Sequence, residues 1–300
     1  MTRRHHPPLV AFLVGVLGIA LFSGMDAVMK GLVLAIGTIA TMFWRNLIGI
    51  GLSGLLYLPR RTGWPSASTM RIHVARGLLS TGMGFLFFWG IARVPLAQAV
   101  ALAFIAPLIA LYLASLLLGE TVGKRTVAAS MLAFGGVLVI FVGQAQADLG
   151  RDALVGSLAI VASAALYALN IILMRRQALV ADPLEITFFQ SVIVTASLLP
   201  AVPLVGIAVP PIETLPGLVL AALLAISSML LLSWAYARAE ASYLAATEYT
   251  AFLWAMLFGW LAFGETVSPY TLAGAALIVA GCILAARRPE EASPALEAAT

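Results

Sequence analysis

Two ionisable residues lie deep inside apolar stretches of the sequence, where a charge is costly. Arg45 is about nine residues into the apolar run Ile36–Leu58, and Glu248 is about six residues into the run Tyr243–Phe263. A charged side chain within hydrocarbon is a candidate for function by default. Arg45 could bind a carboxylate through two parallel hydrogen bonds. Glu248 could bind an ammonium group or titrate as a proton carrier.

Each of these charges also has a structural interpretation. Arg45 could pair with Asp26 or bind carbonyl groups between packed helices, and Glu248 could reach the cytoplasmic interface from near a helix start. Asp26 has the weakest claim to function. Lys30 follows it by four residues, which is the spacing of an ordinary ion pair along a helix.

Uncharged polar and aromatic residues within the apolar runs are a broader set of candidates for binding a small molecule. Tyr167 and Asn170 are three residues apart and therefore share one face of a helix. Aromatic faces can hold an ammonium group or stack on another ring, although Trp and Tyr also populate membrane interfaces. The set comprises Ser23, Asn46, Trp89, Gln98, Phe104, Tyr167, Asn170, Gln190, Trp234, Tyr243 and Tyr249.

The elements that carry these residues are predicted to be ten transmembrane helices, an all-α membrane protein. Of 300 residues, 62% are hydrophobic and 10% charged, against about 45–50% and about 25% in soluble domains. A spanning helix needs about 20 apolar residues. The apolar runs are Leu9–Met29, Ile36–Leu58, Val74–Ile91, Leu96–Leu118, Thr126–Val142, Leu154–Met174, Ile186–Ile207, Leu215–Tyr236, Tyr243–Phe263 and Tyr270–Ala286.

Several functional classes are disfavoured. Cys282 is the one cysteine, so the sequence offers neither a disulfide framework nor a thiol-rich metal site. His5, His6 and His73 fall outside the predicted spans, which argues against a histidine-based catalytic dyad or metal site in the membrane. We therefore expect no enzyme, no metal and no cofactor. The basic residues are scattered between apolar runs, so nucleic-acid binding is not implied either.

Basic residues predict that both chain termini are cytoplasmic, because positively charged loops stay on that side. With this orientation only Lys30, Arg93 and Arg151 lie on the opposite side, and Arg45 lies within a span. The thirteen cytoplasmic bases are Arg3, Arg4, Arg60, Arg61, Arg71, Arg76, Lys124, Arg125, Arg175, Arg176, Arg238, Arg287 and Arg288.

An internal repeat with an offset of 145 residues divides the chain into two five-helix halves. Trp89–Val122 and Trp234–Val267 are identical at 12 of 34 positions, including the tryptophan, an arginine and the sequence GETV. The halves are residues 9–143 and 154–286, with short cytoplasmic tails at 1–8 and 287–300. Because five is odd, the second half must cross the membrane inverted, an arrangement typical of transporters that bind substrate between their halves.

The charges support this inversion. The basic residues of the first half's cytoplasmic loops have neutral counterparts in the second half, where the same loops would face outward. The pairs are Arg60 and Val205, Arg61 and Gly206, Lys124 and Pro269, and Arg125 and Tyr270. Two inverted halves suit alternating access better than a permanent pore, and no span carries the repeated polar stripe of a channel.

Pro107, the sequence LLLGET at Leu116–Thr121 and the second GET at Gly264–Thr266 resemble the drug/metabolite transporter superfamily, EamA type. The resemblance covers essentially the whole chain, although Phe252 stands where the second half would often repeat the proline. It implies an exporter in the inner membrane of bacteria, in the branch that exports aromatic and other neutral amino acids. Multidrug export and a channel-like facilitator are the alternatives.

Other residues are expected to shape the fold and its motion. Pro107 removes a backbone hydrogen bond in mid-span, so the resulting kink could act in gating or be purely architectural. Small residues of the fifth and tenth spans, such as Gly136 and Gly274, allow close approach of helices, within one chain or in a homodimer. Glu120 and Glu265 each end a span, which favours a capping role. The expected partners are a small-molecule substrate and the lipid bilayer.

Overall fold

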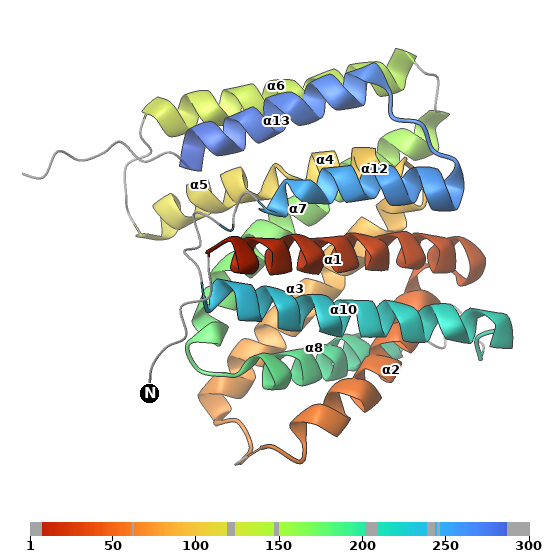
Figure 1. Ribbon diagram of the computed structural model, residues 1–300, viewed down its shortest axis with the longest axis vertical. Coiled ribbons are helices and arrows are strands. Elements are labelled where there is room, and N and C mark those ends of the chain that lie inside the picture. Colours follow the sequence, from red (N-terminus) through yellow and green to blue (C-terminus); the bar gives the residue numbers. More distant parts are fainter. Residues whose placement is uncertain are drawn as a thin grey trace, which may run out of the picture.

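The computed structural model describes residues 8–61, 63–118, 124–146, 150–201, 209–238, 244 and 247–286. Its described residues form helices without any strand (Figure 1). The α-helices are α1 (Pro8–Ile36), α2 (Thr38–Tyr57), α3 (Ala67–Ile91), α4 (Leu96–Ala103), α5 (Ala106–Leu118), α6 (Lys124–Gln146), α7 (Gly150–Ala178), α8 (Pro183–Leu198), α10 (Leu215–Tyr236), α12 (Thr250–Phe263) and α13 (Pro269–Ala286). Short 3₁₀ turns, η1 (Leu199–Ala201) and η2 (Ile212–Thr214), lie between α8 and α10.

Side-chain caps set where several helices begin. Ser66 precedes α3 and accepts a hydrogen bond from the Thr69 backbone nitrogen, and Asp182 precedes α8 and accepts from the nitrogens of Leu184 and Glu185. Such caps supply acceptors for N–H groups that have no partner within the helix. The cap at Ser66 places the start of α3 seven residues before the predicted span, so the helix also includes His73.

The two halves pack against each other through matched pairs of helices. The most extensive contacts are α6 with α13, α1 with α10, α3 with α7, and α2 with α8. With the 145-residue offset, α1 and α10 correspond to α7 and α3, so the second and third of these contacts are counterparts. Figure 1 shows α6 and α13 as a pair along one edge, with α2 and α8 toward the other. The predicted two-repeat all-helical membrane fold is confirmed.

Glycine allows α6 and α13 to approach closely. A Cβ atom added at Gly136 would lie 2.6 Å from the Gly274 carbonyl oxygen, and one at Gly274 would lie 2.5 Å from the Gly136 carbonyl oxygen. Separations this short leave no room for a side chain on either helix. Of the two interpretations of these small residues, Gly136 and Gly274 therefore serve packing within the chain.

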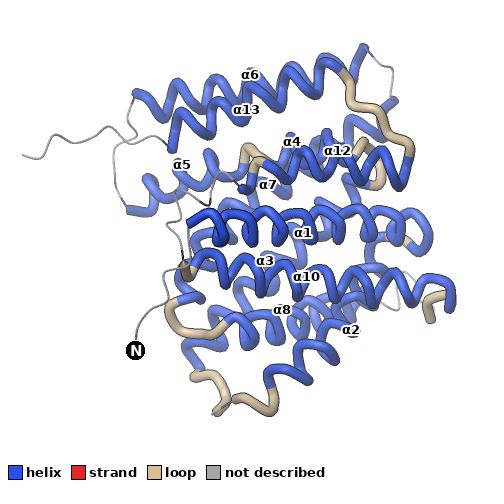
Figure 2. The backbone as a smooth tube through the Cα atoms, viewed as in Figure 1, coloured by secondary structure: helices blue, strands red, loops and turns tan. Residues whose placement is uncertain are grey.

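Six of the helices are long and apolar enough to cross a membrane, by length and composition, within the part of the chain described. Four shorter apolar helices, of 10–17 residues, accompany them, including Leu96–Ala110 and Thr250–Phe263. The predicted fourth span is not one continuous helix, because it is interrupted between α4 and α5 (Figure 2). Large apolar side chains lie exposed on the outer surface, for example Met131 and Phe134 of α6, as suits a chain solvated by lipid.

Candidate functional site

The interruption between α4 and α5 lies at Phe104 and Ile105, near the middle of the predicted fourth span. The Ile105 nitrogen donates to the Leu102 carbonyl and the Leu108 nitrogen to the Ile105 carbonyl, each three residues back instead of four. Pro107 has no N–H to give to the carbonyl four residues before it, which favours this tightening. The kink expected at Pro107 is therefore present.

A second interruption lies at Tyr249, which is the counterpart of Phe104 at the 145-residue offset. Here there is no proline, because Phe252 occupies that place. Instead the Thr247 and Thr250 hydroxyls donate to backbone carbonyls three residues back, at 2.6 Å in both cases. Side-chain hydroxyls compete in this way with the backbone hydrogen bonds of a helix. The two halves thus reach similar geometry through different residues.

The two interruptions meet in space. The rings of Phe104 and Tyr249 are 5.8 Å apart between centroids and nearly perpendicular. Cys282 of α13 donates from its thiol to the Phe104 carbonyl oxygen at 3.3 Å, and its side chain also hydrogen-bonds with that of Tyr249. Two predicted candidates, one from each half, are therefore brought together where both backbones depart from regular helix.

Glu248, next to this point, lies within a group of tyrosines that we call the Glu248 cluster: Tyr167, Tyr236 and Glu248. The Tyr236 hydroxyl donates to Glu248 at 3.0 Å, and Tyr167 is close enough to interact electrostatically with Glu248. Glu248 is exposed, and Tyr167 and Tyr236 are 37% and 38% exposed. The cluster therefore presents one accessible carboxylate flanked by aromatic rings, a combination that suits an organic ammonium.

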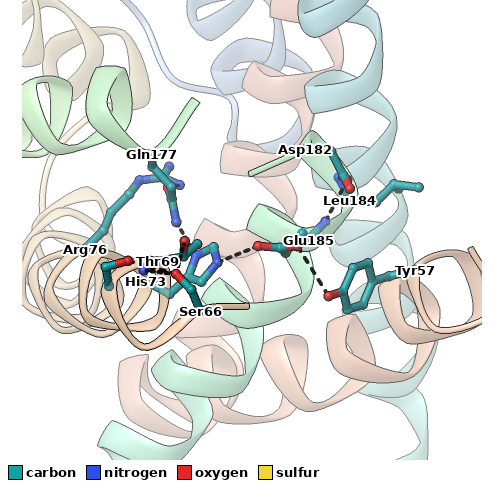
Figure 3. A network of polar contacts seen from close by, with 10 residues as sticks. Tyr57, Ser66, Thr69, His73, Arg76, Gln177, Asp182, Leu184 and Glu185 are labelled. Atoms are coloured by element: carbon teal, nitrogen blue, oxygen red, sulfur yellow. Dashed lines mark hydrogen bonds and ion pairs between the residues drawn. The ribbon is translucent and has the colours of Figure 1, made fainter. Parts of the chain in front are cut away.

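A second polar group, the Arg76 network, joins α2 and α3 of the first half to α7 and α8 of the second (Figure 3). Arg76 donates to Asn170 at 3.3 Å and to Gln177 at 2.5 Å. Gln177 is 2.6 Å from His73 Nδ1, and His73 Nε2 is 3.0 Å from Glu185. Tyr57 completes the network through a longer contact with Glu185, of 3.4 Å.

One prediction about this region is wrong. His73 was expected outside the spans, but it lies within α3 and is buried, at 1% exposure. The reason is that the helix begins at the Ser66 cap, before the hydropathy of the sequence rises. Arg76 belongs to the predicted run Val74–Ile91 and lies in the same helix, buried at 6% exposure. The described residues still contain no group of His, Cys, Asp or Glu able to hold a metal ion.

An ion pair between Lys30 and Glu265 joins the two halves at another place. Lys30 forms an ion pair with Glu265 and donates to the Val94 carbonyl at 2.6 Å, while Glu265 accepts from the Leu96 nitrogen at 2.7 Å. Gly264 makes this possible, because its left-handed backbone (φ 64°) ends α12 and turns the chain back. Glu265 therefore accepts from the first N–H of α4, a helix of the other half, whereas a capping role within its own half was expected. The spacing of Asp26 and Lys30 also allowed an ion pair between these two residues, but Lys30 pairs with Glu265 instead.

Asp26 and Arg45 form no ion pair with each other among the described residues. They interact electrostatically, and one carboxylate oxygen of Asp26 is buried with no hydrogen-bond partner in that part of the chain. Ser23, one helical turn before Asp26, is 2% exposed. Asp26 is thus an electrostatic partner of Arg45, as the structural interpretation of Arg45 requires. A role of Arg45 in binding substrate stays a prediction.

Trp89 and Trp234 have the same local partner in each half. The Arg93 guanidinium lies 3.4 Å from the centroid of the Trp89 ring and donates to the Trp89 carbonyl at 2.8 Å. Arg238 lies 4.2 Å from the Trp234 ring and donates to the Trp234 carbonyl at 3.1 Å. The repeated tryptophan and arginine therefore form matching caps at the ends of α3 and α10.

Gln98 lies apart from the other candidates, in a buried network. It donates to Gln144 at 3.3 Å and to Ser157 at 3.1 Å, and Ser157 donates to Gln144 at 3.0 Å. Gln98 is 4% exposed, so a substrate could reach it only after these bonds rearrange. The predicted candidates Tyr243 and Glu120 lie outside the described residues.

Sequence reasoning missed Arg76, His73, Gln177 and Tyr236 as members of the site. One signal for His73 was available, because Ser66 precedes Ala67–Ile91 in the manner of a helix cap and puts His73 inside that helix. Tyr236 and Gln177 carried no signal, because their contacts join residues far apart in the sequence.

Comparison with known proteins agrees with this architecture. Residues 9–142 and 154–287 each match the EamA-like transporter family. The pseudopaline exporter of Pseudomonas aeruginosa is 28% identical over 92% of this chain and 95% of its own length. The riboflavin transporter of Rhizobium johnstonii is 31% identical over 90% of this chain and 88% of its own, and the probable terminal-alkyne amino-acid exporter of Streptantibioticus cattleyicolor is 31% identical over 70% and 71%.

A protein of known crystal structure shares the fold. It is 22% identical in sequence, superposes with a TM-score of 0.62, and is matched over 94% of this chain and 99% of that chain. At this level of identity the similarity shows the fold alone.

The helices, the repeat and these matches define a multi-pass membrane transporter built from two homologous halves. The chain belongs to the EamA-like transporter family. It lies in the bacterial inner membrane, and its partners are a small-molecule substrate and the lipid bilayer. Members of this family are transporters and not enzymes.

Proposed function

We propose that the chain exports small amphipathic metabolites, above all aromatic and other neutral amino acids, by alternating access. The observation that carries this proposal is the Glu248 cluster, where an accessible carboxylate lies among tyrosine rings next to the two helix interruptions. Such a site suits a substrate with an ammonium group and an apolar or aromatic body. The relative from Streptantibioticus cattleyicolor, an amino-acid exporter by name, supports the same class.

The proposal includes the membrane arrangement. The chain crosses the membrane ten times with both termini in the cytoplasm, and the halves at 9–143 and 154–286 are inverted relative to each other. Interrupted helices near the middle of the membrane are the usual place for substrate in inverted-repeat transporters. Phe104 and Tyr249 mark that level here, and Pro107 allows the first-half helix to bend as the site opens.

Alternating access gives a role to two polar contacts that join the halves, the Arg76 network and the Lys30–Glu265 ion pair. The Arg76 network involves the first half of α3, and the Lys30–Glu265 pair lies beyond the other end of that helix, beside Val94. These two contacts between the halves therefore lie at different levels along α3. Opening the site to one side of the membrane and then to the other requires that each of these two contacts break in turn.

Replacing Glu248 by glutamine is expected to reduce saturable uptake of amino acids by at least about tenfold, since a charged hydrogen bond contributes roughly 1.5–3 kcal/mol. The measurement is uptake of radiolabelled phenylalanine, tryptophan, methionine and threonine by proteoliposomes, with and without a pH gradient. Arg45→Gln is the comparison variant, and protein-free liposomes are the blank.

The outcomes separate the alternatives. Saturable uptake that the gradient does not change would identify facilitated transport. Uptake driven by the gradient would identify proton coupling, and loss of that gradient dependence in Glu248→Gln would assign the coupling to Glu248. If no amino acid enters above the blank while lipophilic cations do, the proposal is wrong and multidrug export replaces it. Glu248 suits that alternative too, because an accessible membrane acid beside aromatic rings also attracts lipophilic cations.

A further inference from the structure

Arg76 fixes the hydrogen-bond roles within its network. A guanidinium carries only N–H donors, so Gln177 must turn its amide oxygen toward Arg76, at 2.5 Å from the guanidinium nitrogen. The amide nitrogen of Gln177 then points at His73 Nδ1, at 2.6 Å. An amide nitrogen is a donor and cannot accept, so Nδ1 of His73 must be the acceptor of this bond.

His73 therefore carries its single ring proton on Nε2. A neutral imidazole has one donor and one acceptor nitrogen, and Nε2 donates to the Glu185 carboxylate at 3.0 Å. The ring stacks on Phe189 of α8, with the centroids 4.9 Å apart and the planes at 17°, and the residue is 1% exposed. Figure 3 shows His73 of α3 between Gln177 of α7 and Glu185 of α8.

A second proton on His73 suits one of these neighbours and not the other. A proton on Nδ1 sets two donors against each other at 2.6 Å, and Gln177 cannot turn over, because its nitrogen would then face the donors of Arg76. On the other side, the bond to Glu185 becomes a charged hydrogen bond, and Phe189 presents the face of its ring to the new cation. Helix α8 therefore suits both forms of His73, whereas α7 suits only the neutral form.

Titratable and charged groups face His73 from the helices packed around it. Glu185 of α8 is in direct contact, and Tyr57 of α2 contacts the same carboxylate at 3.4 Å. Arg76, on α3 itself, is reached through Gln177. The ionisable group in direct contact with His73 is thus an acid, which stabilises the charged ring. Further charges around the network are Arg61 and Asp182, which interact electrostatically with Tyr57, and the exposed Arg176 of α7.

We infer that His73 is a proton-binding residue, and that its protonation separates α3 from α7 while α3 stays in contact with α8. The Arg76 network joins the two halves, so the proton weakens one of the two contacts that must break for the site to open. The inference rests on the proposed function and deepens it, because it makes a proton the regulator of opening. In the proposed orientation the starts of α3 and α8 and the end of α7 lie at the cytoplasmic side, so acid favours opening toward the cytoplasm.

The test follows the distance between α3 and α7 by electron paramagnetic resonance as the pH falls from about 8 to about 5, the interval in which histidine commonly changes its charge. Spin labels are attached through Val74→Cys on α3 and Met174→Cys on α7, at positions that are 40% and 37% exposed. The full-length protein also carries Cys282→Ser, because Cys282 is its one native thiol. Acid is expected to raise the ratio of longer to shorter distances by about fivefold to about a hundredfold, since a buried donor without an acceptor is costly. An unchanged ratio would overturn the inference.

Two variants assign the response to His73. In His73→Gln the new amide can accept from Gln177 and donate to Glu185 but cannot gain a proton, so the shorter distance should persist in acid. In Gln177→Glu the new carboxylate accepts from both Arg76 and the charged His73, so the shorter distance should persist there too, even if His73→Gln fails to fold. A response to acid that survives in both variants would contradict the inference. Glu248→Gln is the control and should keep the response; if it alone abolishes the response, the proton binds at Glu248 and the inference is wrong.

The failure of the inference and that of the proposed function look different, because the distance measurement contains no substrate. If the protein transports phenylalanine but the distance between the labels does not respond to acid, only the role of His73 is lost. If the distance responds as expected and both variants abolish the response, but no amino acid is transported, the proton-binding role of His73 stands and the proposed function is wrong.

Discussion

Glu265→Ala is expected to lower the free energy of unfolding by about 3–5 kcal/mol, because it leaves a buried cation without its counter-charge. Lys30 is 4% exposed, and Glu265 is both its ion-pair partner and the acceptor for the Leu96 backbone N–H. Removing the carboxylate therefore leaves the Lys30 ammonium without its counter-charge and the Leu96 N–H without its acceptor. The measurement is thermal unfolding of the purified protein in detergent.

A matched control is available in the same chain. Glu213 lies in the exposed turn η2, so Glu213→Ala should change stability by less than about 0.5 kcal/mol. Adding Lys30→Met to Glu265→Ala removes the stranded charge and should recover part of the loss. Equal effects of Glu265→Ala and Glu213→Ala would mean that the pair does not hold the halves together.

Gly136→Leu is expected to prevent α6 and α13 from packing, with loss of most of the folded protein. The nearest atom that its Cβ would meet is the backbone carbonyl oxygen of Gly274, at 2.6 Å, so no rotation of a side chain relieves the overlap. Overpacking of a tight interior costs roughly 1–3 kcal/mol even where side chains can move. The yield of monodisperse protein in size-exclusion chromatography of detergent extracts measures the effect.

The neighbouring glycine provides the control. A Cβ at Gly135 would meet nothing within 4 Å, so Gly135→Leu should give normal yield. The two variants add the same side chain to adjacent positions and so make the same change in hydrophobicity. If both variants fold equally well, the close contact between α6 and α13 is not what holds this pair together.

Much of the architecture was predictable because the bilayer imposes strong rules on sequence. Long apolar runs mark spans, and the repeat containing Trp89 and Trp234 identified two homologous halves. The proline at Pro107 predicted the first interruption. The second was not predicted, because it depends on Thr247 and Thr250, whose hydroxyls are ordinary on a helix surface and act here only through local hydrogen bonds.

The site was predicted less completely, since its members come together only in the folded chain. Glu248 and Tyr167 were found from their rarity in apolar runs, but their mutual proximity was not. The spacing of four residues suggested Asp26 as a local partner for Lys30, whereas its partner Glu265 is 235 residues away. The predicted run Val74–Ile91 left His73 outside the helix, and only the cap at Ser66 brings it in.

Counterflow of phenylalanine tests most directly whether the chain is an alternating-access carrier of amino acids. Proteoliposomes are loaded with a high concentration of unlabelled phenylalanine and diluted into a trace of labelled phenylalanine, and internal label is followed over time. The proposed mechanism predicts a transient accumulation of label above its equilibrium level, which is absent in Glu248→Gln. A channel would let label approach equilibrium without exceeding it, and that result, or no uptake at all, would contradict the proposal.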